Sequence, residues 1–441
     1  MFNRKLKPIL GLILGVVLVV LASAWTASAT NKNFEVWLVD QSNSPELSYG
    51  GKIYIYEGSN LMGKNLDKVK PASVIDVSAE TSQMCLNETG ANPVRPHMLL
   101  FNSNNSHAIL SFVASGHVVI YDAAKQTPVA CIRTTPGVDG ITQAHAAFPS
   151  PDNSYILLAN QNGKLLERID TDYKNNSYTL NTNSTLNLAT CVTANNVACQ
   201  LANVRPDNAP ICPIIPDSSS DLVFVTLRGG GMFVVDPKSN PISILAEYDM
   251  KTVKGNGCGG VEAKGNMYMN SGGGTSGQLY GFDIYRFPLK NYKQSNPVNT
   301  PRPLVTFADN SAGRDSHGMT VTNQDRFVWV ADRGQKKIEM ISVDSDQRVN
   351  TIDLIASGDI KPTPDLLDIS PSGNRVFMSL RGPTPLSADP HVSLGPIPGL
   401  GVIQVSQNGR NGTLAGIIPI SNMGADKVEH ADAHAIRVRI K

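Results

Sequence analysis

Residues 317–344 read HGMTVTNQDRFVWVADRGQKKIEMISVD, and this stretch decides the fold. It predicts three short strands, GMTV, RFVWVAD and KIEMISVD, with a polar corner at Thr322–Asp325 and a tight turn after Asp332. The middle strand alternates and is rich in β-branched and aromatic residues, as a half-buried antiparallel strand should be. A single unit of this size cannot bury both of its faces, so the pattern indicates a repeat protein.

Units with the same pattern recur along the chain and begin at His97, His145, Cys212, Gly257, His317, Asp365 and His434. The last unit, HAIRVRIK, stops after its first strand, whereas the segment NFEVWLVD at residues 33–40 matches a second strand without a first. Joining these two ends completes one unit. The sequence therefore predicts an all-β fold, a seven-bladed β-propeller that is closed by the C-terminal strand joining the N-terminal strands.

One stretch leaves an alternative open. Residues 171–207 are rich in Asn and Thr, and we interpret them as an excursion from one loop. If they hide a further blade, the ring has eight blades. In either case we expect residues 30–441 to form one domain, because the blades of a ring have no separate cores.

The N-terminus predicts export. Basic residues at Arg4, Lys5 and Lys7 precede an apolar run at residues 8–21, and the small residues Ala27–Ala29 offer a cleavage site. This pattern is typical of a signal peptide, here residues 1–29, and indicates a periplasmic or secreted protein. An uncleaved membrane anchor is the alternative, and we expect no membrane span after the signal is removed.

Six cysteines in an exported chain predict disulfides. Cys85–Cys131 would lie within one repeat, and Cys191–Cys199 would close a local loop. Cys212 and Cys258 can be interpreted as a disulfide between adjacent blades or as a pair of metal ligands.

Composition excludes several classes of function. The chain has 441 residues, with 37 Gly, 28 Pro, 17% charged residues and a net charge of +1. That balance provides no basic surface for nucleic acid, so we expect no nucleic-acid partner. We also expect the protein to be a monomer. The sequence also lacks a GxSxG elbow, a P-loop, an HExxH motif and a CxxCH motif.

The segments VWVADRG, YILLANQNG and VFMSLRG resemble the YVTN-type repeats of exported seven-bladed propellers. That superfamily is similar to lactonase-like propellers and to the propeller domain of nitrous-oxide reductase, and more distantly to methanethiol oxidases. The resemblance implies the fold. Similarity to the reductase favours copper, although this chain has no second copper domain, and lactonase-like relatives use carboxylates and amides instead of histidines.

Histidines recur at one place in the repeat. The first position of the seven units holds His97, His145, His317 and His434, which are four of the eight histidines in the chain. The start of the first strand faces the central channel of a propeller, so we expect these imidazoles to meet at its mouth. Converging imidazoles bind copper, zinc or iron. We predict a transition-metal site there, with copper favoured and with Asp365 as a further ligand or a base.

Several other side chains are predicted at the same mouth. Cys258, Glu262 and Asp315 are spare ligand candidates, and Asp315 and Asp432 could hold the second nitrogens of the histidines. Sixteen residues after the start of their units stand Arg228, Arg333 and Arg381, with Gln41 in the composite unit. Three guanidinium groups would favour a small polar or anionic ligand, and Arg333 is a candidate catalytic residue. The arginines can also be interpreted as structural bridges between blades.

Three functions remain open at this point. The first is a metalloenzyme for redox or hydrolytic chemistry on a small polar or anionic substrate. The second is a metal carrier or ligand-binding scaffold without turnover. The third is an interaction propeller without a metal, in which the register of histidines is only a relic of duplication.

Overall fold

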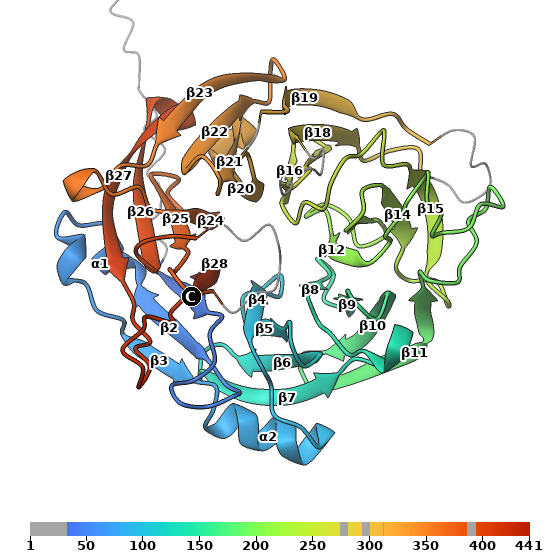
Figure 1. Cartoon of the computed structure of the whole chain (residues 1–441), viewed down its shortest axis with the longest axis horizontal. Coiled ribbons are helices and arrows are strands. Elements are labelled where there is room, and N and C mark those ends of the chain that lie inside the picture. Colours follow the sequence, from blue (N-terminus) through green and yellow to red (C-terminus); the bar gives the residue numbers. More distant parts are fainter. Residues whose placement is uncertain (1–32, 274–280, 293–299, 312, 386–393) are drawn as a thin grey trace, which may run out of the picture. The chain divides into compact units, whose positions relative to one another are not determined.

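Seven sheets of four antiparallel strands make up the β-structure of the described residues, which are 33–273, 281–292, 300–311, 313–385 and 394–441. In this computed structural model the sheets stand as blades around a common axis, each with one strand innermost (Figure 1). The chain is therefore a seven-bladed β-propeller, as the repeats predicted. The predicted signal peptide, residues 1–29, lies outside the described residues.

The two ends of the chain share one blade. From the inside outward its strands are β28 (Ala433–Ile440), β1 (Phe34–Asp40), β2 (Lys52–Glu57) and β3 (Ser73–Asp76). β28 runs antiparallel to β1, with Val36 opposite Val438 and Leu38 opposite Ile436. The C-terminal strand thus supplies the first strand that the N-terminal unit lacks, and the predicted closure is confirmed.

The next three blades follow in chain order. The first consists of β4 (Pro96–Phe101), β5 (His107–Phe112), β6 (His117–Asp122) and β7 (Thr127–Arg133). The second consists of β8 (Ala146–Pro149), β9 (Tyr155–Asn160), β10 (Leu165–Asp172) and β11 (Ser177–Asn187). The third consists of β12 (Pro210–Ile214), β13 (Val223–Leu227), β14 (Met232–Asp236) and β15 (Ser243–Tyr248). The eight-bladed alternative is wrong, because β11 is the outermost strand of its own blade. Residues 171–207 are therefore only partly a loop, because β11 lies within them. The sequence did not reveal this strand, because its composition is polar and rich in Asn.

The last three blades complete the ring. Their strands are β16 (Gly260–Ala263), β17 (Asn266–Asn270), β18 (Phe282–Pro288) and β19 (Leu304–Asp309), then β20 (Ser316–Val321), β21 (Phe327–Asp332), β22 (Lys337–Ser342) and β23 (Gln347–Asp353), then β24 (Pro364–Ile369), β25 (Arg375–Leu380), β26 (Gly399–Ser406) and β27 (Asn411–Pro419).

The described helices are short and lie in connections. They are α1 (Gly58–Leu61), α2 (Glu80–Thr89) and the 3₁₀ turns η1 (Leu66–Lys68), η2 (Val138–Gly140), η4 (Asn323–Asp325), η5 (Ser357–Asp359) and η6 (Gln407–Gly409). α2 lies beside β7 on the outer side of its blade (Figure 1). Among the described residues we find no helix that is long and apolar enough to cross a membrane.

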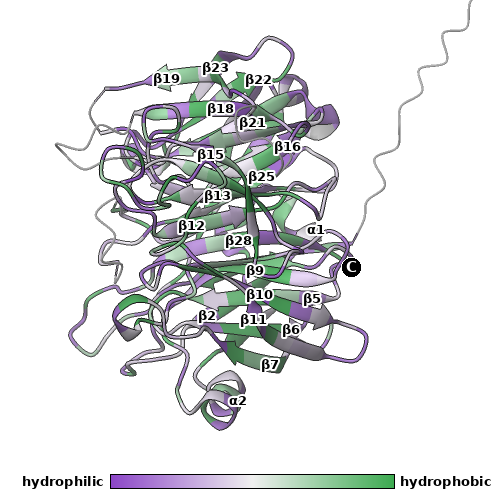
Figure 2. Cartoon of the chain, turned by 90° about the vertical axis from the view of Figure 1, so that its right-hand side faces the viewer, coloured by the Kyte–Doolittle hydropathy of each residue, from purple (hydrophilic) through white to green (hydrophobic). Residues whose placement is uncertain are grey.

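Aromatic side chains fill the spaces between blades. Trp37 of β1 is fully buried, and its ring meets Phe101 of β4 edge-on with the centroids 5.3 Å apart. Trp329, at the equivalent place in β21, is equally buried and donates to the Gly409 carbonyl of the next blade at 2.8 Å. Hydrophobic residues follow the strands, and hydrophilic ones gather in the connections (Figure 2). The period-2 alternation of the repeats thus becomes a core between sheet faces.

All six cysteines form disulfides, Cys85–Cys131, Cys191–Cys199 and Cys212–Cys258. The first ties α2 to β7, the second closes the loop after β11, and the third joins β12 to the segment before β16 in the adjacent blade. The predicted pairs are confirmed, and Cys212–Cys258 is a bridge between blades. Three disulfides fit an exported protein.

Candidate functional site

The innermost strands bring the predicted histidines to one end of the blades. His97, His317 and His434 are the second residues of β4, β20 and β28, and His145 directly precedes β8. The His97 ring stacks on His434 with the centroids 3.9 Å apart and meets His145 edge-on at 4.6 Å. His317 lies 5.4 Å from His434, measured between ring centroids. All four rings are buried. We call these four histidines together with Asp365 of β24 the axial cluster.

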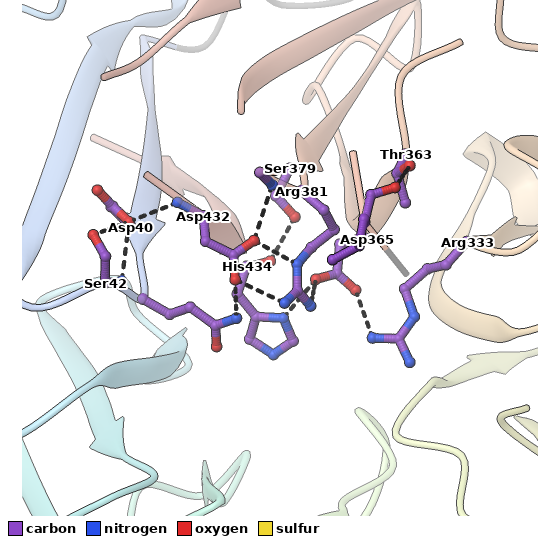
Figure 3. Close-up of polar contacts among 12 residues, drawn as sticks. Asp40, Ser42, Arg333, Thr363, Asp365, Ser379, Arg381, Asp432 and His434 are labelled. Atoms are coloured by element: carbon purple, nitrogen blue, oxygen red, sulfur yellow. Dashed lines mark hydrogen bonds and ion pairs between the residues drawn. The ribbon is translucent and has the colours of Figure 1, made fainter. Parts of the chain in front are cut away.

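The Asp365 carboxylate lies against two of the four imidazole rings, those of His317 and His434. Its Oδ2 accepts from Nδ1 of His434 at 2.6 Å, and its Oδ1 lies 2.6 Å from Nδ1 of His317, at an angle outside hydrogen-bond geometry. The Nη1 atoms of Arg381 and Arg333 reach the same carboxylate at 2.8 and 3.4 Å (Figure 3). Burial alone would raise the pKa of Asp365, but the two histidines and two arginines outweigh burial and hold that pKa well below its ordinary value. Asp365 is therefore an ionised, fully engaged carboxylate.

The neighbours of His97 and His145 decide which ring nitrogens carry protons. Nδ1 of His145 donates to the Ile211 carbonyl at 2.9 Å, because a carbonyl can only accept. Nδ1 of His97 lies 3.0 Å from Oε1 of Gln41, whose amide nitrogen donates to Asp432 at 2.6 Å, so this Nδ1 is also a donor. Burial, followed by the neighbouring imidazoles and arginines, holds the pKa of His97 well below 6.5, so its ring is neutral. Its Nε2 therefore carries a lone pair.

The Nε2 atoms of His97 and His145 face each other 3.3 Å apart. When both rings are neutral with Nδ1 as the donor, two lone pairs meet, and they repel unless a proton or a cation lies between them. Two imidazole ligands of one tetrahedral ion, each about 2.0–2.1 Å from it, stand about 3.3 Å apart. His317 and His434 turn Nδ1 to a carboxylate, the pairing that orients metal-bound histidines in proteins. The donor set therefore fits a transition metal.

The four histidines do not form one compact set of ligand atoms. Over the residues that the structure describes, the only three or more His, Cys, Asp or Glu side chains with ligand atoms within 4.8 Å of one another are His145, Cys212 and Cys258. The two cysteines are already bonded to each other. That all four histidines hold one ion stays a prediction, and His97 with His145 form the pair at the spacing of shared ligands.

Three other predicted ligand positions contribute differently. Cys258 is bonded to Cys212, and Glu262 of β16 accepts from the Ser218 N–H at 2.9 Å. Asp315 was a spare ligand candidate and a candidate partner of an imidazole, but it pairs with an arginine instead. The carboxylate that does hold imidazole nitrogens is Asp365.

Arg333 and Arg381 are bridges between blades and not free cations. Nε and Nη2 of Arg381 pair with the two oxygens of Asp432 at 2.7 and 2.8 Å, and its Nη1 pairs with Asp365 (Figure 3). Nε of Arg333 pairs with Asp315 at 2.7 Å and its Nη1 lies near Asp365. Because the three aspartates belong to successive blades, each arginine links two blades. The aspartates neutralise the charges of both arginines, which favours the interpretation of these residues as structural bridges. Ligand binding by Arg333 and Arg381 and a catalytic role of Arg333 stay predictions.

Arg228 stands apart from this network. Its Nε pairs with Asp207 at 2.6 Å and its Nη1 donates to Asn162 at 2.6 Å. Its side chain is 39% exposed, in contrast to the buried Arg333 and Arg381. Its predicted role in ligand binding stays a prediction.

Sequence reasoning missed Arg95. It directly precedes β4 and stands two residues before His97. Its positive charge contributes to the lowered pKa of His97, after burial and the neighbouring imidazoles. The spacing to His97 was the available signal. Because no other unit has an arginine at the equivalent position, comparison of the repeats did not reveal Arg95.

The buried histidines predict a pH dependence of stability. Burial lowers the pKa of both His97 and His434, so below about pH 6.5 these rings bind fewer protons in the folded protein than in the unfolded chain. The free energy of unfolding of the metal-free protein should therefore fall from pH 7 to pH 5, by up to ~1.4 kcal/mol per pH unit for each such histidine. Urea unfolding at several pH values measures this slope. His97→Asn should reduce the slope, and an equal slope in both proteins would contradict the assignment.

No family model matches the chain, and no curated protein matches it. Solved structures share its fold. The chain is similar to the periplasmic gluconolactonase of Pseudomonas aeruginosa, with 13% identity and a TM-score of 0.58 over 92% of this chain and 100% of that one. It is also similar to a Bacteroides fragilis protein provisionally named a 6-phosphogluconolactonase, with 11% identity and a TM-score of 0.57 over 93% and 99% of the two chains. At these identities the likeness shows the fold alone.

Proposed function

We propose that this protein is an exported propeller that holds a transition-metal ion on its axial histidines and uses it for redox or hydrolytic chemistry on a small polar or anionic substrate. One observation carries the proposal. His97 and His145 both use Nδ1 as a donor, and their Nε2 atoms face each other at the spacing of two ligands of one ion. His317 and His434, backed by Asp365, are the further ligand candidates.

Neutral imidazoles suit copper, zinc or iron(II), and copper is the favoured ion. A bound ion of this kind supplies Lewis acidity and, for copper or iron, one-electron chemistry. The protein's own part is to keep the imidazoles neutral and correctly oriented. Gln41 and the Ile211 carbonyl fix the rings of His97 and His145, and Asp365 fixes the other two. Three disulfides and a periplasmic structural neighbour support an address outside the cytosol.

Metal content tests the proposal directly. Protein purified from its export compartment without chelators should contain about one transition-metal ion per chain, measured by elemental analysis. The double variant His97→Ala with His145→Ala should fall well below that, because both ligands of the closest pair are lost. His430→Ala is the matched control, since this ring is partly exposed and bonds to Asp426. Stoichiometric metal in the double variant would refute the site.

The loaded protein then separates an enzyme from a carrier. Azide is a small anion that binds an open coordination position of Cu(II) and changes its visible spectrum. A catalytic site keeps such a position, whereas a carrier with a closed shell of ligands leaves the spectrum unchanged.

A further inference from the structure

Arg95 is held in a conformation that ordinary residues avoid. Its φ is +61°, in the left-handed region, and it precedes Pro96, which restricts its backbone further. Its N–H donates to the Asn43 side chain at 3.2 Å, and its carbonyl accepts from the Val113 N–H at 3.0 Å. Strain of this kind persists where the surroundings fix it, and it is concentrated at binding and catalytic sites. The fold thus fixes the backbone of Arg95, two residues before His97, in this unusual conformation.

The guanidinium of Arg95 has no hydrogen-bond or ion-pair partner among the residues that the structure describes. Its Nε is buried without a hydrogen bond, and across the described part of the chain no carboxylate forms an ion pair with it. Arg333 and Arg381, in contrast, each lie between two aspartates. Burial lowers the pKa of Arg95, and the charge of Asp432 opposes that shift without coming into contact. A half-buried cation without an acceptor carries a desolvation cost that an anion would offset.

Asp432, the carboxylate whose charge acts on Arg95, is already saturated with donors. Oδ1 of Asp432 accepts from Nε of Arg381 at 2.7 Å and from the Gly382 N–H at 3.0 Å. Oδ2 accepts from Nη2 of Arg381 at 2.8 Å and from Gln41 at 2.6 Å. A carboxylate offers about four lone-pair positions, so Asp432 has none left for Arg95.

We propose that Arg95 is the anchor for a carboxylate group of the substrate, which it holds beside the axial cluster. A guanidinium presents a planar fork that matches a carboxylate with two parallel hydrogen bonds. This inference rests on the proposed function, because it names the substrate class of the same site. It also replaces Arg333 and Arg381 as the residues that select an anion.

The site should respond to metal loading. A divalent ion on His97 and His145 adds positive charge close to Arg95, so the affinity for a carboxylate should rise when the ion is bound. Metal-free protein should still bind the carboxylate through Arg95, but more weakly. Measurements in both states therefore separate the arginine's contribution from that of the ion.

Acetate is the probe, and acetamide is its uncharged isostere. Saturation-transfer NMR is carried out on two samples, the metal-free protein and the zinc-loaded protein. Zinc replaces Cu(II) because it is diamagnetic and does not broaden the signals of the two probes. Wild type should bind acetate at least tenfold more tightly than acetamide, and Arg95→Gln should remove that difference. Arg326→Gln is the matched control, because it makes the same charge change at an exposed position by the corner between β20 and β21, at the other end of the strands from His317.

Two readouts keep this test distinct from the test of the metal site. Arg95→Gln should retain the metal content and the melting temperature of wild type, because it removes neither a metal ligand nor a bridge between blades. An unchanged preference for acetate in Arg95→Gln, or equal binding of acetate and acetamide by wild type, would overturn the inference. If wild type takes up no metal, the proposed function fails, and the comparison in metal-free protein still decides the role of Arg95.

Discussion

Removal of Ala433–Lys441 should leave no soluble, folded protein. These residues form β28, the innermost strand of the blade that contains both chain ends, and they include the buried side chains of Ala433, His434, Ala435 and Ile436. Without β28 the inner edge of β1 has no partner, and an exposed strand edge promotes aggregation. The deletion would also remove His434, which bonds to Asp365 of one neighbouring blade and stacks on His97 of the other. Soluble yield, circular dichroism and melting temperature measure the effect.

A rearranged chain provides the matched control. The Lys441 N–H donates to the Asn33 carbonyl at 2.9 Å, so the end of β28 lies beside the start of β1. Moving residues 433–441 in front of Asn33 through a two-residue hairpin turn should therefore restore the fold with the same strands. Lys441→Ala should have only a small effect, below ~1 kcal/mol, because it removes partly exposed ion pairs with Glu35 and Glu57. A deletion variant with an unchanged melting curve would show that the ring is closed in another way.

Asp365→Ala should be the most damaging single substitution in the axial cluster. The change leaves Arg333 and Arg381 buried with only one carboxylate each, and it releases the Nδ1 atoms of His317 and His434. Removal of one partner from such a buried network costs roughly 3–5 kcal/mol of unfolding free energy. Metal content should fall as well, because two of the rings lose the group that orients them. Urea unfolding and elemental analysis on the same preparations measure both effects.

Two comparisons separate charge from shape at this position. Asp365→Asn keeps the size of the side chain but lacks the negative charge, so it should lie between wild type and Asp365→Ala in stability. Asp426→Ala removes a surface carboxylate and should leave the melting temperature nearly unchanged. Because the pKa of Asp365 is depressed, its contribution is present above an ordinary carboxyl pKa of 3.8 and is lost as the pH falls through its lower folded value. An Asp365→Ala protein as stable as wild type would mean that the network around this carboxylate adds nothing.

The sequence by itself determined the architecture. Three local properties suffice to predict seven blades and their closure. They are the alternation in RFVWVAD, its recurrence in unit after unit, and the two incomplete ends, NFEVWLVD as a second strand and HAIRVRIK as a first strand. The same register placed His97, His145, His317 and His434 at one end of the inner strands. A ring turns equal places in a repeat into neighbours in space, so the pattern alone was enough to bring these rings together.

Only the tertiary structure decided the partners of each side chain. Asp315 and Asp432 were predicted beside imidazoles but bind Arg333 and Arg381, whereas Asp365 holds the imidazoles. Their places in the repeat do not distinguish these outcomes. The pairing depends on side-chain direction and on which acceptors are already occupied, and partners come from the same blade for Asp315 and from adjacent blades for Asp365 and Asp432. Arg95 shows the same limit, since its importance arises from a backbone conformation and from the saturation of Asp432. The periodicity of the sequence determines where the strands lie. Competition among neighbouring hydrogen-bond donors and acceptors determines which charged side chains are paired within the protein and which stay available to a ligand.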